Sequence, residues 1–229
     1  MKRLLIFAIS VIAVACSVDG NSSKLNETNS RLMAGTTKQL QYNGKCSWSS
    51  DEPLIASVDN GLVKAHRVGT TYINAKSSAC KVEVYPKYTT YIDPFLEWGA
   101  RYASFEAIMI DNGCIEVKTD STGSLWTDEA TNTQYMCLIS NGGITSSAII
   151  TSLAKLDLCT NFLLERYIPL GYVDGYGVFT SLDRQSGITI SYQSKYKDEY
   201  ALWVVCVPSD TRTTTNDIIN VYTKLSNAQ

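Results

Sequence analysis

The 229-residue sequence contains a single histidine, His66, and no excess of charge of either sign. One imidazole is too few for most zinc sites, and for the Ser-His or Cys-His arrangements that activate a nucleophile. Lys and Arg number 20 and Asp and Glu 22, so the formal net charge is −2. A chain this close to neutral has no overall attraction to nucleic acid or anionic lipid. We therefore expect no metal, no cofactor and no nucleic-acid partner.

Sequence motifs of the common enzyme classes are also missing. No Gly-x-Ser-x-Gly elbow, Walker loop or His-Glu-x-x-His motif occurs, and Gly175-Tyr176-Gly177 lacks the third glycine of a dinucleotide fingerprint. Two carboxylates brought together by folding could still hydrolyse a glycosidic bond. Spacing along the chain selects no pair among the candidates, which are Glu97, Asp128, Glu129, Asp174 and Asp183. A non-catalytic protein is the favoured interpretation.

The N-terminus carries the one long apolar run, residues 4–14, preceded by Lys2 and Arg3. This run is too short to span a bilayer stably and has the layout of an export signal. It ends in Ala13-Val14-Ala15-Cys16, which resembles a bacterial lipobox, whose cysteine receives diacylglycerol before cleavage. The resemblance implies a signal peptide over residues 1–15 and a lipidated Cys16 that anchors the protein to a membrane. An ordinary secretory signal cut after Ala15 is the alternative.

Residues 16–29 are rich in Ser and Asn and are predicted to form a flexible tether. Ser17, rather than Asp, follows the cysteine, which resembles the pattern of lipoproteins sorted to the outer membrane. We expect a cell-envelope protein that is lipid-anchored in the outer membrane, facing either the periplasm or the outside.

Residues 30–87 alternate apolar and polar side chains in short runs separated by turn residues, as in a β-sandwich. Asn60-Gly61 between two apolar runs predicts a hairpin, because both residues tolerate positive φ. The expected strands cover residues 38–42, 54–58, 62–65, 70–75 and 81–85, with a further one near Trp48.

Several motifs in this region, in the order and spacing of one family, resemble the bacterial Ig-like domain, group 2. They are Trp48-Ser49-Ser50-Asp51, Ile55-Ala56-Ser57-Val58-Asp59, Gly61-Leu62-Val63, Gly69-Thr70 and Ile73-Asn74-Ala75. The resemblance implies a small all-β Ig-like sandwich that acts as a spacer or adhesion module and has no catalytic residues. We expect Trp48 in its core and His66 in a solvated loop.

Residues 88–229 predict an α+β domain with an antiparallel sheet and two main helices, joined to the first by a protease-sensitive linker at residues 86–91. The helices are expected at residues 100–110 and 155–167, the second with Leu156, Leu158, Phe162, Leu163 and Tyr167 buried and with Pro169 and Gly171 ending it. Residues 201–207 are almost entirely apolar, as in a strand covered on both faces. A short C-terminal helix beginning at Thr215 or Asn216 would carry Ile218, Ile219, Tyr222 and Leu225 on one side.

The two halves of this second domain share a pattern. Gly143-Ile144-Thr145 and Gly187-Ile188-Thr189 both follow a turn within similar segments. An internal duplication of an α-β-β-β unit is one interpretation, and a chance likeness of two hairpins is the other. This overall shape behind an Ig-like module resembles uncharacterised lipoproteins of gut Bacteroidetes, a resemblance that implies no activity.

Aromatic residues gather near the domain junction and in predicted loops, where they could bind a ligand or pack the seam. They are Tyr88, Tyr91, Phe95, Trp98, Trp126, Tyr172 and Tyr176. Trp98, Trp126 and Tyr176 are the candidate ligand contacts for a glycan or protein. Separately, Asp120-Ser121-Thr122 resembles a Bacteroidetes O-glycosylation acceptor with Ser121 modified, or it is simply a polar turn.

Six cysteines remain after lipidation: Cys46, Cys80, Cys114, Cys137, Cys159 and Cys206. Export permits disulfides, and a Cys46–Cys80 bridge would lie within the Ig-like module. Apolar neighbours surround Cys137 and Cys206, so we expect most of the six to be reduced, buried thiols.

Three hypotheses of function follow. The first is a non-catalytic envelope lipoprotein whose Ig-like spacer presents a C-terminal domain for binding or adhesion. The second is a hydrolase with a carboxylate pair in that domain. The third is a structural subunit of an envelope complex whose partner is another envelope protein. A glycan, an envelope protein or a host protein is the possible partner of the chain.

Overall fold

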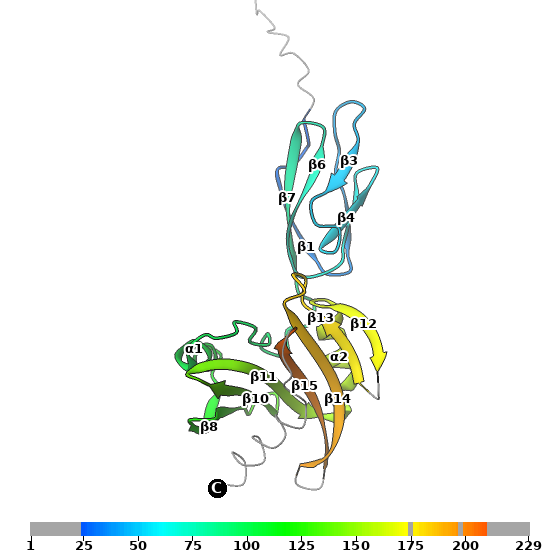
Figure 1. Cartoon of the computed structure of the whole chain (residues 1–229). Helices are drawn as coiled ribbons and strands as arrows, with labels where there is room; N and C mark the ends of the chain where they lie inside the picture. Colours follow the sequence, from blue (N-terminus) through cyan, green and yellow to red (C-terminus); the bar gives the residue numbers. More distant parts are fainter. Residues whose placement is uncertain (1–23, 174–175, 197–198, 210–229) are drawn as a thin grey trace, which may run out of the picture.

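The structure is a computed structural model that describes residues 24–173, 176–196 and 199–209. Within these residues the chain is mostly β-structure, with two short α-helices and sheets that are antiparallel except for one strand pair. Figure 1 shows an N-terminal part, residues 24–85, that extends from one end of a larger C-terminal part. The predicted β-rich composition is confirmed.

The N-terminal part consists of two small sheets. Its strands are β1 (Asn29–Met33), β2 (Thr37–Gln39), β3 (Trp48–Ser50), β4 (Ala56–Asp59), β5 (Leu62–Ala65), β6 (Gly69–Ala75) and β7 (Ser78–Tyr85). One sheet has the order β1-β7-β6-β3 and the other β2-β5-β4. Inward-facing residues of both sheets, such as Val63 and Ile73, form one apolar core.

The predicted hairpin at Asn60-Gly61 joins β4 and β5, and both residues have positive φ, 49° and 81°. Gly61 is required here because an added Cβ would lie 2.5 Å from the carbonyl oxygen of Leu40. The sequence pattern missed β1, which pairs in parallel with β7. Leu25 forms a bridge with Tyr42, so the described end of the predicted tether packs against this part.

The C-terminal part is one eight-stranded sheet with two helices. In chain order it contains α1 (Tyr102–Asp111), β8 (Ile115–Asp120), β9 (Gly123–Asp128), β10 (Thr133–Ser140), β11 (Gly143–Ser152), a 3₁₀ turn (Leu153–Lys155), α2 (Leu156–Leu164), β12 (Ile168–Val173), β13 (Tyr176–Thr180), β14 (Ser186–Tyr196) and β15 (Glu199–Pro208). The sheet order is β12-β13-β14-β15-β11-β10-β9-β8.

The order of strands is symmetrical about the β15–β11 pair. Each helix is followed by four strands that run as a meander, and the last strand of each meander pairs with the other in the middle of the sheet. The duplication stays a prediction, with four strands per unit rather than three. The matched segments fall on different strands, since Gly143 begins the fourth strand of the first meander and Gly187 lies in the third of the second.

Both faces of the central strands are buried. One face, with Tyr135, Ile149 and Val204, packs against α1, α2 and the linker that precedes α1. The opposite face carries a second apolar cluster, which includes Leu125, Met136 and Trp203. The prediction that residues 201–207 are covered on both faces is therefore confirmed for residues 201–206, each of which is at most 9% exposed.

The second helix is shorter than predicted. It ends at Leu164, and Pro169 and Gly171 lie in the edge strand β12, where a missing N–H does no harm to the ladder. Leu156 is 39% exposed rather than buried, while Phe162, Leu163 and Tyr167 are buried as expected. The C-terminal helix predicted from residue 215 lies outside the described residues.

Candidate functional site

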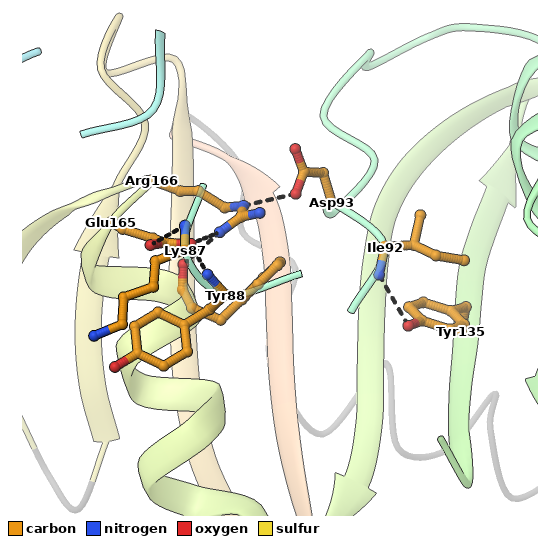
Figure 2. Close-up of polar contacts among 8 residues, drawn as sticks. Lys87, Tyr88, Ile92, Asp93, Tyr135, Glu165 and Arg166 are labelled. Atoms are coloured by element: carbon orange, nitrogen blue, oxygen red, sulfur yellow. Dashed lines mark hydrogen bonds and ion pairs between the residues drawn. The ribbon is translucent and has the colours of Figure 1, made fainter. Parts of the chain in front are cut away.

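The contact between the two parts is built around Glu165, the residue that follows α2. Figure 2 shows its carboxylate facing the linker, where it accepts the backbone N–H of Lys87 at 3.0 Å and that of Tyr88 at 2.9 Å. Glu165 is only 6% exposed. A buried carboxylate needs compensation by hydrogen bonds and an opposite charge. The N–H groups of Lys87 and Tyr88 provide the hydrogen bonds.

Arg166 provides the opposite charge. Its Nη1 lies 2.6 Å from Oε1 of Glu165, and its Nε donates to Asp93 at 2.6 Å. The guanidinium also lies 3.9 Å above the centre of the Phe162 ring, within cation–π distance. The pair thus links the end of α2 to two positions of the chain segment that connects the two parts.

A second set of contacts reaches the same place from the N-terminal part. Val68 N–H donates to the carbonyl of Glu165 at 2.7 Å, and Arg67 Nε donates to the carbonyl of Tyr167 at 3.0 Å. Leu182, in the β13–β14 turn, packs against the core of the N-terminal part. Hydrogen bonds and apolar contacts from several elements therefore join the two parts at this junction. The sequence predicts a protease-sensitive linker at residues 86–91, and the structure shows that the backbone N–H groups of Lys87 and Tyr88 within it are hydrogen-bonded.

The linker aromatics pack inward and do not form a binding surface. Tyr91 and Phe95 are 4% and 6% exposed, and each makes an edge-to-face contact, with Phe162 and Phe105 respectively. Tyr135 Oη accepts the N–H of Ile92 at 3.0 Å, as Figure 2 shows. Burial raises the pKa of Tyr91 to about 12. These rings belong to the core of the C-terminal part.

Trp98 lies at the edge of an open hollow of about 810 Å³ at one end of the sheet. The hollow is lined by Trp98, Gly99, Arg101, the β10–β11 turn (residues 140–145) and Pro208. Trp98 is half-buried, and its Nε1 donates to Ser186 Oγ at 3.0 Å, which fixes the plane of the indole. We call this feature the Trp98 hollow.

The backbone around the Trp98 hollow is tightly specified. Gly99 N–H donates to the Ile144 carbonyl, and Ile144 N–H donates to the Ala100 carbonyl, at 2.8 and 2.9 Å. A Cβ on Gly143 would lie 3.0 Å from the Gly99 backbone, so a glycine is needed where the linker crosses the β10–β11 turn. Asn141 and Gly142 form that turn with positive φ, 51° and 78°.

The residues around the Trp98 hollow carry groups that can bind a polar ligand. An indole face and peptide groups can stack against and hydrogen-bond a polar ligand, and Arg101 adds a positive charge. Among the described residues that line the hollow there is no Asp, Glu, His or Cys, so it holds no acid–base pair.

The other predicted aromatic contacts lie elsewhere. Trp126 is 3% exposed in β9, with Nε1 donating to Ser124 at 2.6 Å, so the expectation that it contacts a ligand in a loop is wrong. Its strand is buried on both faces, with Trp126 in the apolar cluster of one face and Leu125 in that of the other. Tyr176 is half-buried at the start of β13, away from the residues of the Trp98 hollow. Tyr172 is 68% exposed and lines a smaller apolar pocket of about 220 Å³ with Leu156 and Phe179.

The candidate carboxylates serve turns in the described structure. Asp128 accepts the N–H groups of Ala130 and Thr131 in the β9–β10 turn, and Glu129 and Glu97 are exposed. Asp183 accepts Ser181 Oγ at 2.5 Å in the β13–β14 turn, a bond that lowers the pKa of this carboxyl. Asp174 lies outside the described residues. No catalytic pair emerges from the four that are described.

All six cysteines of the described residues are free thiols in this structure. The possible Cys46–Cys80 bridge is not formed, because Cys46 precedes β3 and Cys80 lies in β7, with β6 between those strands. Cys46 is half-buried and the other five are buried. Burial raises the pKa of Cys137, Cys159 and Cys206 to about 12, so these thiols have little thiolate at neutral pH.

His66 and Trp48 each differ from their predicted surroundings. His66 lies in the loop between β5 and β6, as predicted, but it is half-buried, with its Nε2 2.7 Å from Ser57 Oγ. Burial, together with the positive charges of Lys64 and Arg67, lowers the pKa of His66. Trp48 packs only against the rim of the N-terminal core and borders an open hollow with Tyr42.

Ser121 is exposed in the turn between β8 and β9, as the sequence predicts. Asp120 Oδ1 accepts both the N–H and the Oγ1 of Thr122 at 2.7 and 2.5 Å, which holds the turn closed. Modification of Ser121 stays a prediction.

Sequence reasoning missed Glu165 and Arg166. A signal was available: two adjacent charged residues lie between the apolar positions Phe162, Leu163 and Tyr167. Charges inside a buried run are uncommon unless paired.

Comparison of the chain with protein-family models, curated proteins and solved structures finds no match. Across the described ranges, no helix has the length and apolar character needed to cross a membrane. Nor do the described residues contain a cluster of three or more His, Cys, Asp or Glu side chains placed to hold a metal ion.

Proposed function

We propose that this chain is a lipid-anchored cell-envelope protein that binds a polar ligand, a glycan or an extracellular protein segment, in the Trp98 hollow. Cys16 carries the lipid, the N-terminal part is an Ig-like spacer domain, and the C-terminal part is the binding domain. Binding rather than catalysis is the conclusion because the hollow offers an aromatic face, peptide groups and a cation, with no acid–base pair among its described lining.

The observation that carries this proposal is the fixed orientation of Trp98. Its Nε1 is held by Ser186, and the neighbouring backbone is bonded to β11 on both sides of Gly99. Pre-positioned aromatic rings bind with a smaller loss of conformational entropy than mobile ones. The contacts of Glu165 and Arg166 with the linker support the proposal further, because they attach the N-terminal spacer to the domain that contains the Trp98 hollow.

Direct binding measurements test the proposal. The mature protein without its lipid is applied to glycan arrays and to extracellular-matrix and envelope proteins, beside Trp98→Ala and Arg101→Ala. Tyr72→Ala is the matched control, because Tyr72 is an exposed aromatic of the N-terminal part, 47% exposed. We expect ligands that bind the wild type and the control but lose about tenfold or more affinity for Trp98→Ala, in line with loss of an aromatic anchor. Ligands that bind all variants equally would contradict the assignment of this site.

An envelope-protein partner is a second candidate, favoured by a separate surface. Large apolar side chains are exposed on α2 and the edge strand β12, namely Leu156, Leu164, Leu170 and Tyr172, at 39%, 41%, 64% and 68%. Exposed apolar groups beside an edge strand are a frequent contact for another protein. Leu170→Lys would abolish co-purification of such a partner and leave ligand binding at Trp98 unchanged.

A further inference from the structure

The second face of the eight-stranded sheet is buried, yet its cluster consists only of strand residues. The side chains are Leu125 from β9, Met136 and Leu138 from β10, Ala148 and Ile150 from β11, and Ala201, Trp203 and Val205 from β15. They are 0% to 9% exposed. A sheet face reaches such low exposure only when another layer lies on it, because neighbouring strands shield each other's edges and not the tips of their side chains.

The cluster forms a continuous band across four neighbouring strands. Directly opposed residues connect Leu125 to Met136, Met136 to Ala148, and Ala148 to Val205. Ile150 opposes Trp203 in the adjacent row. Both helices of the described chain, together with the linker, belong to the cluster on the opposite face. The layer over the second face therefore comes from outside the described elements.

We propose that the C-terminal segment, residues 216–225, is this layer, docking as an amphipathic helix across β9, β10, β11 and β15. The sequence gives the segment one apolar side, with Ile218, Tyr222 and Leu225 spaced by three and four residues and Ile219 beside them. Val221, three residues after Ile218, is also apolar, and the remaining positions, Asn216, Asp217, Asn220, Thr223 and Lys224, are polar. Such a helix is unstable alone and forms when its apolar side is buried.

The dimensions match. A helix of these ten residues is about 15 Å long. Four neighbouring strands span three interstrand spacings, about 14 Å. The segment also starts in the right place, because β15 ends at Pro208 and is one of the four strands of the band. Residues 210–215 can span about 20 Å when extended. This length is enough to connect the end of β15 to a helix that lies across the neighbouring strands.

This assignment goes beyond the proposed function. It also explains why β15, in the middle of the sheet, has apolar side chains on both faces. It also closes a surface that would otherwise be a large exposed apolar patch, which is an aggregation hazard in a secreted protein.

Hydrogen exchange on the full chain is the primary test. We expect the amides of residues 218–225 to exchange at least tenfold more slowly than those of residues 210–214, and Ile219→Asp to remove that protection. Thr214→Asp is the matched control, an added carboxylate in the same tail outside the helix, and should leave protection unchanged. Amides of residues 218–225 that exchange as fast as those of 210–214 would overturn the proposal.

Fluorescence of Trp203 supplies a second, independent measurement. In a chain that ends at Ser209, the emission of Trp203, isolated by subtracting the spectrum of the matching Trp203→Phe protein, should shift to the red. Its quenching by acrylamide should rise several-fold. Trp126, buried on the opposite face, should stay shielded if the sheet is intact. Should Trp203 stay shielded in a shortened chain that remains monomeric, the tail would not be the native cover; a shortened chain that dimerises where the full chain does not would support the proposal, because it would have exposed an apolar face.

Discussion

The carboxylate of Glu165 accepts the backbone N–H of Tyr88 at 2.9 Å, although 77 positions separate the two residues. The same carboxylate accepts Lys87 N–H and pairs with Arg166. A single side chain at the end of α2 thereby fixes the path of the chain between the two parts. Loss of that side chain should lower the stability of the protein and make the linker more accessible to protease.

Glu165→Ala should lower the free energy of unfolding by about 3 kcal/mol or more, because Arg166 would be left buried without its buried partner and two linker N–H groups would lose their acceptor. Urea unfolding measures this effect. Glu83→Ala is the matched control: Glu83 pairs with Arg31 at the surface, with the two side chains 45% and 69% exposed. That change should cost less than about 1 kcal/mol.

Limited proteolysis gives the same prediction a local readout. Cleavage within residues 86–91 should be slow in the wild type and fast in Glu165→Ala, with Glu83→Ala resembling the wild type. A linker cut equally fast in all three proteins would contradict the role assigned to Glu165.

The sequence allowed the prediction of elements that depend on local pattern. Asn60-Gly61 defined a hairpin, and the spacing of Phe105 and Met109 indicated α1, because turn geometry and helical periodicity are local properties. Trp98 could be picked as a candidate because aromatic residues are prominent in composition. The Trp98 hollow could not be predicted, since Ser186, Pro208 and the β10–β11 turn come close to Trp98 only through the order of strands in the sheet.

Long-range pairing explains the remaining errors. β1 was missed because it is stabilised by pairing with β7, more than fifty positions away, and its short sequence has no distinctive pattern. The early end of α2 depends on Val68 and Arg67, which bond the carbonyls of Glu165 and Tyr167. Neither contact can be predicted from the sequence around α2.

Thiol labelling should distinguish Cys46 from the other cysteines. In Cys16→Ala protein, Ellman's reagent should react rapidly with one thiol, because Cys46 alone is half-exposed among the six. The buried thiols, with the pKa of Cys137, Cys159 and Cys206 raised to about 12, should react only on unfolding. Cys46→Ser should remove the rapid phase. Four thiols after denaturation and no rapid phase would instead indicate an oxidised Cys46–Cys80 pair.

Stability should fall as the pH drops through the ordinary pKa of histidine, 6.5. Burial, with Lys64 and Arg67 nearby, lowers the pKa of His66 in the folded protein, so the unfolded chain takes up the proton first and is favoured below this pH. Above it His66 is neutral in both states and the penalty vanishes. The effect is small because His66 is half-exposed. Urea unfolding between about pH 7.5 and pH 5.5 should show a larger loss for the wild type than for His66→Gln. Equal losses of stability in the two proteins would show that protonation of His66 does not cause the pH dependence.

Cys16→Ala should release the protein from the membrane fraction, because the acyl chains of a lipoprotein provide the anchoring energy. Labelling with a radioactive or clickable fatty acid, followed by fractionation, measures both the modification and its consequence. Ser17→Ala is the neighbouring control and should stay labelled and membrane-bound. Fatty-acid label that persists in Cys16→Ala would exclude Cys16 as the lipidated residue.

The central β11–β15 pair has a consequence for the order in which the molecule is assembled. Synthesis completes β11 at Ser152 but does not begin β15 until Glu199, so the first meander waits for its central partner while some fifty further residues are made. β15, of which residues 201–206 are buried, is thus the last described strand to become available. Closing that pair is a long-range step that limits how fast the sheet can form. Until it closes, the edge of β11 is open to strands of other chains, so this part needs either rapid completion or protection by a chaperone.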